Sequence, residues 1–399
     1  MAGLAEVLRL GGAAYLRTHE LSTPQARAWR AICACRTPLL GGQQMACAAC
    51  GHRHWHYHSC RNRHCPQCGA RAKEAWLRGR LAEVLDVPYV HLVFTLPHDL
   101  NSLYRSGPKW FIEALFASVA ATLKEFAANP RWMGVEDGQS AFSLVLHTWS
   151  QDLSQHLHLH AVMACGVLAA DGPWHRPVRR PDFLFPVRAL SRVFRAKFMA
   201  ALCQRAEDQR AQDGDAPEDA NLSAAGRKAL YRHDWVVYAK APLGGPAQVL
   251  AYLSRYSHRT AIGNERIESA DAHEVVFTVR ADEQGGKRRM RLPTEEFIRR
   301  LLLHVLPKGV KRIRHYGVLA NGCKKTQLAS AREALHQPAP DARACESARG
   351  FMARVAHIEI HTCPRCRGPL HVAAVSSGRR HLPAPGHEIT AMAQPRAPP

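Results

Sequence analysis

The spacing of apolar residues predicts a series of strands and helices along the middle of the chain. Alternating or continuous apolar runs ending at proline or glycine predict strands at 87–97, 142–149, 156–168, 234–242, 274–279 and 287–293. Apolar residues at helical spacing predict helices at 107–127, 186–212, 246–262 and 294–306. This order favours the α+β class, with an antiparallel sheet that carries helices on one side.

Composition divides the chain into three regions. Residues 1–80 hold seven of the 13 cysteines and predict an N-terminal helix followed by a zinc-binding module that contacts DNA. Residues 85–330 contain the strands and helices above. Residues 331–399 are rich in Ala, Pro and Arg and end in AMAQPRAPP, so we expect a disordered tail with few residues to bury.

The charge indicates the kind of partner. Lys and Arg total 54 against 33 Asp and Glu, a formal net charge of +21, which favours a polyanion such as nucleic acid. The N-terminus lacks the features of a secretion signal, and no apolar run of about 18 residues occurs. We therefore expect a cytoplasmic, nucleoid-associated protein without a membrane partner. No GxxxxGK[ST] sequence occurs, so no nucleotide cofactor is expected.

Two CxxC pairs are the most specific local motif. Fourteen residues separate Cys47-Ala-Ala-Cys50 from Cys65-Pro-Gln-Cys68, a spacing that predicts one structural Zn²⁺ bound by four thiolates. Other residues offer alternatives for this site or for a second one: Cys60, His64, Cys33 and Cys35. A half knuckle near the C-terminus is either part of a second zinc site or a remnant: His361, Cys363, Cys366 and His371.

The sequence QHLHLHAV places histidines at 156, 158 and 160. In a strand these three side chains share one face, while Leu157 and Leu159 point to the other. Two imidazoles on neighbouring pleats can bind one divalent ion. Taken alone, the motif is more typical of an exposed strand.

The predicted helix at 246–262 carries Gln248, Tyr252 and Tyr256 at intervals of four, which places them on one face. A tyrosine pair alone usually packs. Beside a metal-binding strand in a basic chain, however, two phenols suit nucleophilic attack on a phosphodiester, and a metal ion would polarise the phosphate.

These motifs resemble rolling-circle insertion-sequence transposases, the two-tyrosine branch of the HUH (His-hydrophobe-His) endonuclease superfamily. The resemblance runs from about residue 30 to 325 and includes CRNRHCPQCG, VFTLPHDL, HTWSQDLSQHLHLHAV, YAKAPLGGPAQVLAYLSRYSHRTAI and LPTEEFIRRLLLHVLPKGVKRIRHYG. It implies an HUH-type catalytic domain at 85–330, with His158 and His160 as metal ligands and Tyr252 and Tyr256 as nucleophiles. It also implies Mg²⁺ or Mn²⁺ as the catalytic ion. The implied substrates are single-stranded DNA at the ends of the protein's own element and target DNA.

The third metal ligand is open at this point. Gln248 is the first choice, because a helix-borne amide near the tyrosines would be a neutral oxygen donor, and three other residues are in reserve: His98, His147 and Gln151. The family pattern has a proline where Leu157 stands, which leaves the role of His156 open. Candidate DNA contacts are Lys240, Arg255 and Arg259.

Three functions fit these observations. The first is transposition through covalent 5′-phosphotyrosine intermediates. The second is a rolling-circle replication initiator or relaxase, which commonly carries a nucleotide-binding domain that this sequence lacks. The third is a non-catalytic zinc DNA-binding protein, which would be expected to have lost the histidines or tyrosines.

Overall fold

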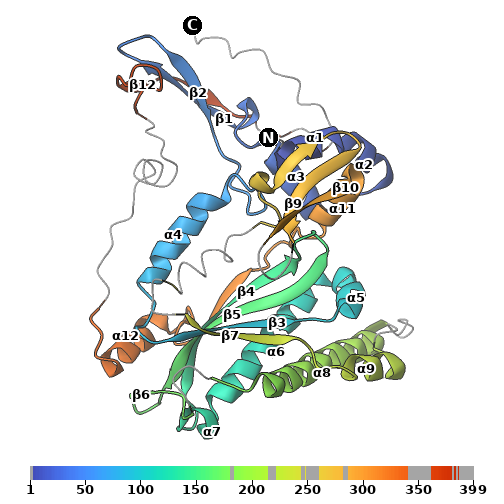
Figure 1. The fold of residues 1–399 in the computed structure, drawn as a ribbon, viewed down its shortest axis with the longest axis vertical. Coiled ribbons are helices and arrows are strands. Elements are labelled where there is room, and N and C mark those ends of the chain that lie inside the picture. The colour runs from blue at the N-terminus through green and yellow to red at the C-terminus, as the bar shows by residue number, and fades with distance from the viewer. Residues whose placement is uncertain are drawn as a thin grey trace.

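A central antiparallel sheet organises the molecule (Figure 1). The computed structural model describes residues 3–179, 184–213, 222–243, 248, 260–281, 286–339, 361–379, 382 and 385. The strand order is β11-β4-β5-β3-β7, and the short β6 pairs with β5. The bounds are β3 Tyr89–Thr95, β4 Gln139–Trp149, β5 Gln155–Leu168, β6 Trp174–His175, β7 Val237–Leu243 and β11 Ile313–Gly317. The antiparallel sheet predicted from the apolar pattern is confirmed.

One face of this sheet is covered by the long helices α6 (Pro108–Ala127) and α8 (Val187–Asp213) (Figure 1). Phe94 of β3 and Leu159 of β5 lie in the same buried cluster as Phe111 of α6 and Phe194 of α8. Because side chains alternate along a strand, the intervening residues of β3 and β5 point to the opposite face. This buried cluster therefore lies on the side of α6 and α8, and the histidines of β5 lie on the other.

A second core joins the N-terminus to a segment far along the chain. Its helices are α1 Leu4–Leu10, α2 Gly12–Thr18, α3 Thr23–Ala34 and α11 Thr294–Leu302. Its strands are β8 Ile267–Ala270, β9 Glu274–Arg280 and β10 Lys287–Pro293, in the order β10-β9-β8. Trp29, Phe277 and Phe297 are buried together in it. The strands predicted at 274–279 and 287–293 thus belong to a separate sheet. The packing also crosses the predicted boundary between 1–80 and 85–330, because α1–α3 bury their apolar faces against this later segment.

A third sheet joins the two ends of the chain. Strand β1 (Gly41–Cys47) pairs with β2 (Arg53–Tyr57) and also with β12 (Leu370–Ser377), all antiparallel. Figure 1 shows β12 beside β1 at one end of the molecule. A tail was expected from residue 331, but residues 361–379 form a cysteine knuckle and a paired strand instead. The backbone of β12 finds hydrogen-bond partners on β1, which composition alone does not reveal.

Helices and short turns connect these parts. They are α4 Gly69–Leu81, α5 Asn101–Ser106, α7 Pro130–Met133, α9 Ala224–Tyr231, α12 Lys324–Ala334, and the 3₁₀ turns Pro38–Leu40, His98–Leu100 and Asn264–Arg266. None of the described helices combines the length and the apolar composition that a membrane-spanning segment needs.

Candidate functional site

Three histidines converge on the sheet face opposite the long helices. His158 lies directly across from His147 of β4 in the strand register, and His160 lies one pleat further along β5. One ring nitrogen of each lies within 4.8 Å of the others. His147 and His160 are buried, and His158 is partly buried. The alternation predicted from QHLHLHAV is confirmed, since Leu157 and Leu159 are buried in the core on the other side.

Hydrogen bonds orient the imidazole rings. The Nδ1 of His158 lies 3.0 Å from the carbonyl oxygen of His156, so it donates and leaves the Nε2 lone pair for a metal ion. The Nδ1 of His160 lies 2.9 Å from the Nε2 of His91, and its Nε2 lies 3.2 Å from the Nδ1 of His147. Two nitrogens bound to one ion at about 2.1 Å would be about 3.0–3.4 Å apart. The separation between His147 and His160 fits such a pair.

The protonation state also suits metal binding. Burial lowers the pKa of His158 to about 4, so its ring is neutral at pH 7. Burial, with the nearby charge of Lys240, likewise lowers the pKa of His91 to about 4. A neutral imidazole can bind a metal ion without first losing a proton.

A third histidine joins the two that the sequence singled out. His147 was a reserve candidate, and it completes the group because β4 and β5 pair in a register that brings it opposite His158. Gln248, the first choice, is an exposed helical residue. The ring of His98 contacts His156 at 2.9 Å and lies outside the group. The group thus includes His147, a reserve candidate, beside the two expected ligands His158 and His160.

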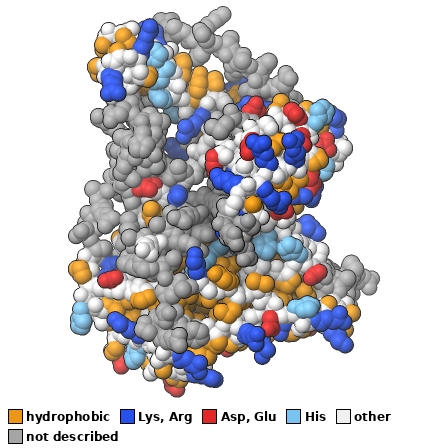
Figure 2. Space-filling model, in the orientation of Figure 1, with side chains coloured by type: hydrophobic (Ala, Val, Ile, Leu, Met, Phe, Trp, Pro, Cys, Tyr) orange, Lys and Arg blue, Asp and Glu red, His pale blue; other side chains and the backbone are white. Residues whose placement is uncertain are grey.

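The expected nucleophiles and two expected DNA contacts lie outside the described residues: Tyr252, Tyr256, Arg255 and Arg259. Lys240 is described, and it is an exposed residue of β7 that pairs with His91 of β3. Tyr238 stands two residues before it, on the same face of the strand, and is 54% exposed. Tyr238 was not among the candidate DNA contacts predicted from the sequence, although in a strand it shares a face with Lys240. In Figure 2, histidine side chains gather below the lobe formed by α1–α3 and β8–β10.

The four cysteines predicted as one zinc site belong to two different groups. One group is Cys35, Cys60, Cys65 and Cys68, and the other is Cys47, Cys50, Cys363 and Cys366. The predicted set is wrong because β1 and β2 form a hairpin between the two CxxC pairs. Cys47 and Cys50 lie at its tip, whereas Cys65 and Cys68 follow its base, and the five residues of β2 span about 16 Å.

The four sulfurs of the group at the hairpin base all lie within 4.8 Å of one another. The Sγ of Cys68 lies 3.4 Å from that of Cys35 and 3.6 Å from that of Cys60. Four sulfurs bound to zinc at about 2.3 Å would lie about 3.8 Å from each other. The backbone N–H of Cys60 also donates to the Sγ of Cys35 at 3.5 Å. These residues therefore fit a structural zinc ion.

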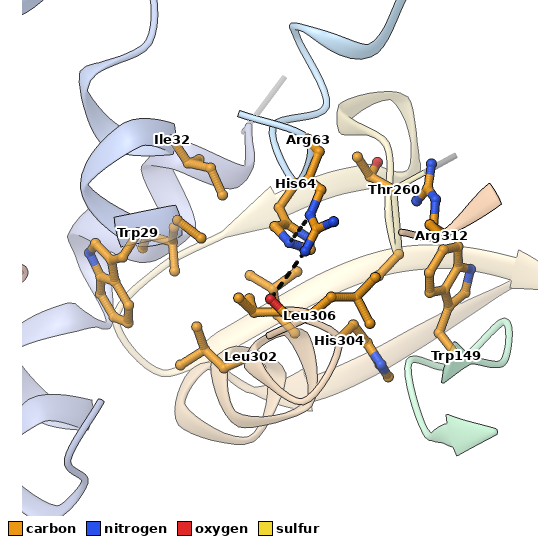
Figure 3. Close-up of a pocket in the computed structure, with 15 residues that line it drawn as sticks. Trp29, Ile32, Arg63, His64, Trp149, Thr260, Leu302, His304, Leu306 and Arg312 are labelled. Atoms are coloured by element: carbon orange, nitrogen blue, oxygen red, sulfur yellow. Dashed lines mark hydrogen bonds between the residues drawn. The ribbon is translucent and has the colours of Figure 1, made fainter. Parts of the chain in front are cut away.

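An arginine between these cysteines connects the group to the central sheet. The guanidinium of Arg63 donates to the carbonyl oxygens of Val310 at 2.7 Å and Pro307 at 3.2 Å. It also donates to the carbonyl oxygen of Leu306 at 3.3 Å (Figure 3). That segment leads directly into β11, which pairs with the histidine-bearing strand β4.

Arg63 lines a pocket that also contacts the three-histidine group, through Trp149. Trp149 lines it together with His64, His304 and Arg312 (Figure 3). The ring of Trp149 stacks on His147 with centroids 4.6 Å apart. The cysteine loop and the three histidines are thus joined through one packed region.

Two family models match parts of this chain. Residues 141–327 match the family model described as "Putative transposase", and residues 7–96 match the "Transposase zinc-binding domain". The zinc-binding match and the cysteine groups together support structural zinc.

Full-length relatives extend the match. The chain is 39% identical over 372 residues to "Putative transposase y4qJ" of Sinorhizobium fredii (strain NBRC 101917 / NGR234), covering 91% of this chain and 92% of that protein. It is 26% identical over 392 residues to "Transposase for insertion sequence element IS801" of Pseudomonas savastanoi pv. phaseolicola, covering 94% and 87%. A solved structure, the conjugative relaxase TrwC in complex with oriT DNA, matches 42% of this chain and 71% of that chain at 17% identity. Its TM-score of 0.24 is too low to show a shared fold. On the sequence matches, the chain belongs to the family of zinc-binding, rolling-circle insertion-sequence transposases.

Proposed function

We propose that this transposase cleaves and rejoins single-stranded DNA at the three-histidine group, through covalent 5′-phosphotyrosine intermediates. The observation that carries the proposal is the convergence of His147, His158 and His160 within 4.8 Å of one another in a chain of this family. Tyr252 and Tyr256, one helical turn apart in the sequence pattern, are the proposed nucleophiles. The substrates are the ends of the protein's own element and the target DNA.

The proposed reaction exchanges one phosphodiester for another. The phenol oxygen of one tyrosine attacks phosphorus, the bond to the 3′ oxygen breaks, and the phenol proton ends on that oxygen. The products are a 5′-phosphotyrosine and a free 3′-hydroxyl. The second tyrosine cleaves a second strand in the same way, and a released 3′-hydroxyl then attacks a phosphotyrosine to rejoin DNA. Because each step breaks one phosphate ester bond and forms another, no nucleotide cofactor is needed.

The three imidazoles would hold the divalent ion, Mg²⁺ or Mn²⁺. When bound, this ion polarises the scissile phosphate and offsets charge on the leaving 3′ oxygen. His156 and His91 position two of the rings through the hydrogen bonds described above. The ligand set is neutral and Mg²⁺ prefers oxygen, so DNA phosphate oxygens and water must complete the shell. Metal affinity without DNA should accordingly be low.

The DNA strand is proposed to run across β7 beside this group. Lys240 is exposed there and suits a backbone phosphate, and the exposed ring of Tyr238 offers a surface for base stacking. Arg255 and Arg259 are proposed as further phosphate contacts because they flank the tyrosines in the sequence. The net charge of +21 supplies the general attraction to DNA.

A nicking assay tests this proposal. Labelled single-stranded oligonucleotides from the ends of the parent element are incubated with protein and Mn²⁺, and covalent adducts are resolved on a denaturing gel. The wild-type protein should form adducts, and the His158→Ala/His160→Ala variant should not. Salt-dependent DNA binding should survive, because the basic surface supplies most of it.

His315→Asn is a matched control, since His315 is a histidine of β11 that contacts Ser143 rather than the three-histidine group. Normal nicking by the double alanine variant would contradict the proposed site. Absence of adducts from the wild-type protein would favour a non-catalytic DNA-binding protein.

A further inference from the structure

We propose that Cys47, Cys50, Cys363 and Cys366 bind a second structural zinc ion, which fastens the C-terminal strand β12 to the N-terminal hairpin β1–β2. These thiols come from opposite ends of the chain, with Cys47 and Cys366 separated by 319 positions. The strand register brings them together, since Cys47, the last residue of β1, pairs with Leu370, the first residue of β12. The family match to a zinc-binding domain ends at residue 96 and does not include the C-terminal pair.

The distances between the sulfurs indicate metal ligation. The Sγ of Cys47 lies 3.4 Å from that of Cys366, and the Sγ of Cys50 lies 3.7 Å from that of Cys363. All four ligand atoms lie within 4.8 Å of one another. A disulfide requires about 2.05 Å between two sulfurs, whereas four thiolates on one zinc ion lie about 3.8 Å apart. The four-sulfur arrangement therefore fits zinc and does not fit two disulfides.

The local backbone at Cys363-Pro-Arg-Cys366 has the form of a zinc knuckle. The N–H of Arg365 donates to the Sγ of Cys363 at 3.4 Å, and the N–H of Gly368 donates to the Sγ of Cys366 at 3.4 Å. Such bonds stabilise thiolates, which are the metal-binding form of cysteine. These two thiols are thus arranged as ligands rather than as ordinary buried side chains.

The knuckle also leaves no room for a side chain at Gly368. A Cβ there would lie 3.3 Å from the Sγ of both Cys47 and Cys366, and 2.8 Å from the Cβ of Ala49. The close approach of the backbone lets the two CxxC turns face each other at this distance.

Among the described residues, the sheet that this ion would hold has almost no apolar core. Its buried cluster consists of four residues, two of which are cysteines of the site: Met45, Cys47, Cys363 and Leu370. Val372 and Val375 of β12 are 47% and 69% exposed. A unit with so little apolar burial usually needs a metal ion or a covalent link to be stable. The second zinc ion would supply that stabilisation and thereby tie the two chain ends together.

Zinc content per chain, measured by inductively coupled plasma mass spectrometry on the full-length protein, tests the proposal. Cys50→Ser and Cys366→Ser change exposed thiols, so neither removes core packing. Each should lower the zinc content by one equivalent, from two to one. Cys50→His should retain the second equivalent, because imidazole can replace a thiolate on zinc. Cys203→Ser and Cys323→Ser are matched controls, since neither residue belongs to a cysteine group, and both should leave the content unchanged.

Hydrogen exchange supplies a second measurement that does not depend on DNA cleavage. In the wild-type protein, the amides of β12 that bond to β1 should exchange slowly. In Cys366→Ser they should exchange at least tenfold faster, while the amides of β4 and β5 keep their protection. Unchanged zinc content in both serine variants would overturn the proposal, as would a wild-type protein with two disulfides at these positions. A wild-type protein that holds two zinc equivalents and protects the amides of β12, yet does not nick DNA, would instead count against the proposed function alone.

Discussion

The Nε2 of His91 lies 2.9 Å from the Nδ1 of His160, across the neighbouring strands β3 and β5. If the Nε2 of His160 binds the metal ion, its Nδ1 carries the proton and donates to His91. The partner of a metal-ligating imidazole fixes the orientation and tautomer of that ring. We expect His91→Ala to weaken Mn²⁺ binding by about 10- to 100-fold, which is typical for the loss of such a partner. Isothermal titration with Mn²⁺ in the presence of element-end DNA measures this.

His91→Gln is the rescue variant, because its amide oxygen can accept the same hydrogen bond. It should recover part of the affinity and lower the Mn²⁺ concentration needed for half-maximal nicking. His315→Asn again serves as the control. Equal Mn²⁺ affinity in wild type and His91→Ala would exclude a positioning role.

The third ligand can be identified by comparing two variants. His147→Ala should raise the Mn²⁺ requirement for nicking at least tenfold, since His147 completes the histidine group. Gln248→Ala should change it by less than threefold. The opposite ranking would restore Gln248 as the ligand and leave His147 as a packing residue beside Trp149.

The two tyrosines should divide the work of cleavage and transfer. The Tyr252→Phe/Tyr256→Phe variant should form no covalent adduct, because no phenol oxygen remains to attack phosphorus. Each single variant should retain some first-strand nicking yet fail to complete transposition, scored with a marked element in cells. A single variant that transposes at the wild-type rate would show that its tyrosine is not a nucleophile.

Two cysteines close in sequence, Cys33 and Cys35, should differ in their effect on zinc content. Cys35→Ala should remove one zinc equivalent and loosen the Arg63 loop, because Cys35 belongs to the four-thiol group. Cys33→Ala, two positions away, should keep both equivalents, since Cys33 is buried in the apolar core of α1–α3 and its burial raises the pKa of its thiol to about 11. Zinc content per chain, measured for both variants, tests this difference. Loss of zinc from Cys33→Ala would contradict the assignment of Cys35, rather than Cys33, to the four-thiol group.

The buried histidines should make stability depend on pH. Burial lowers the pKa of His304 from 6.5 to about 4, so between these values the unfolded chain binds more protons than the folded one. The free energy of unfolding should therefore fall as pH drops from about 6.5 to 4, by up to about 1.4 kcal/mol per pH unit for such a histidine. Urea unfolding at pH 7, 6 and 5 measures this. In His304→Gln, the free energy of unfolding should depend less steeply on pH than in the wild type. Identical slopes would contradict the lowered pKa of His304.

Local patterns in the sequence predicted the strands β3, β4, β5, β7, β9 and β10 and the helices α6, α8 and α11, but not β1, β2, β11 or β12. The alternation in QHLHLHAV placed His158 and His160 on one face and Leu157 and Leu159 in the core, because strand geometry alone determines it. The apolar spacing likewise predicted α6 and α8, which the structure places at Pro108–Ala127 and Val187–Asp213. The basic charge favoured nucleic acid before any fold was known.

Only the tertiary structure decided which distant residues meet. His147 joins the histidine group because β4 and β5 pair in one particular register, and a shift by one residue would turn it to the opposite face. The two CxxC pairs were predicted to form one group but belong to two, because the β1–β2 hairpin separates Cys47 from Cys65 and β12 brings Cys366 close to Cys47. Periodicity acts within one element, whereas a metal site depends on the path of the whole chain, which local spacing does not encode.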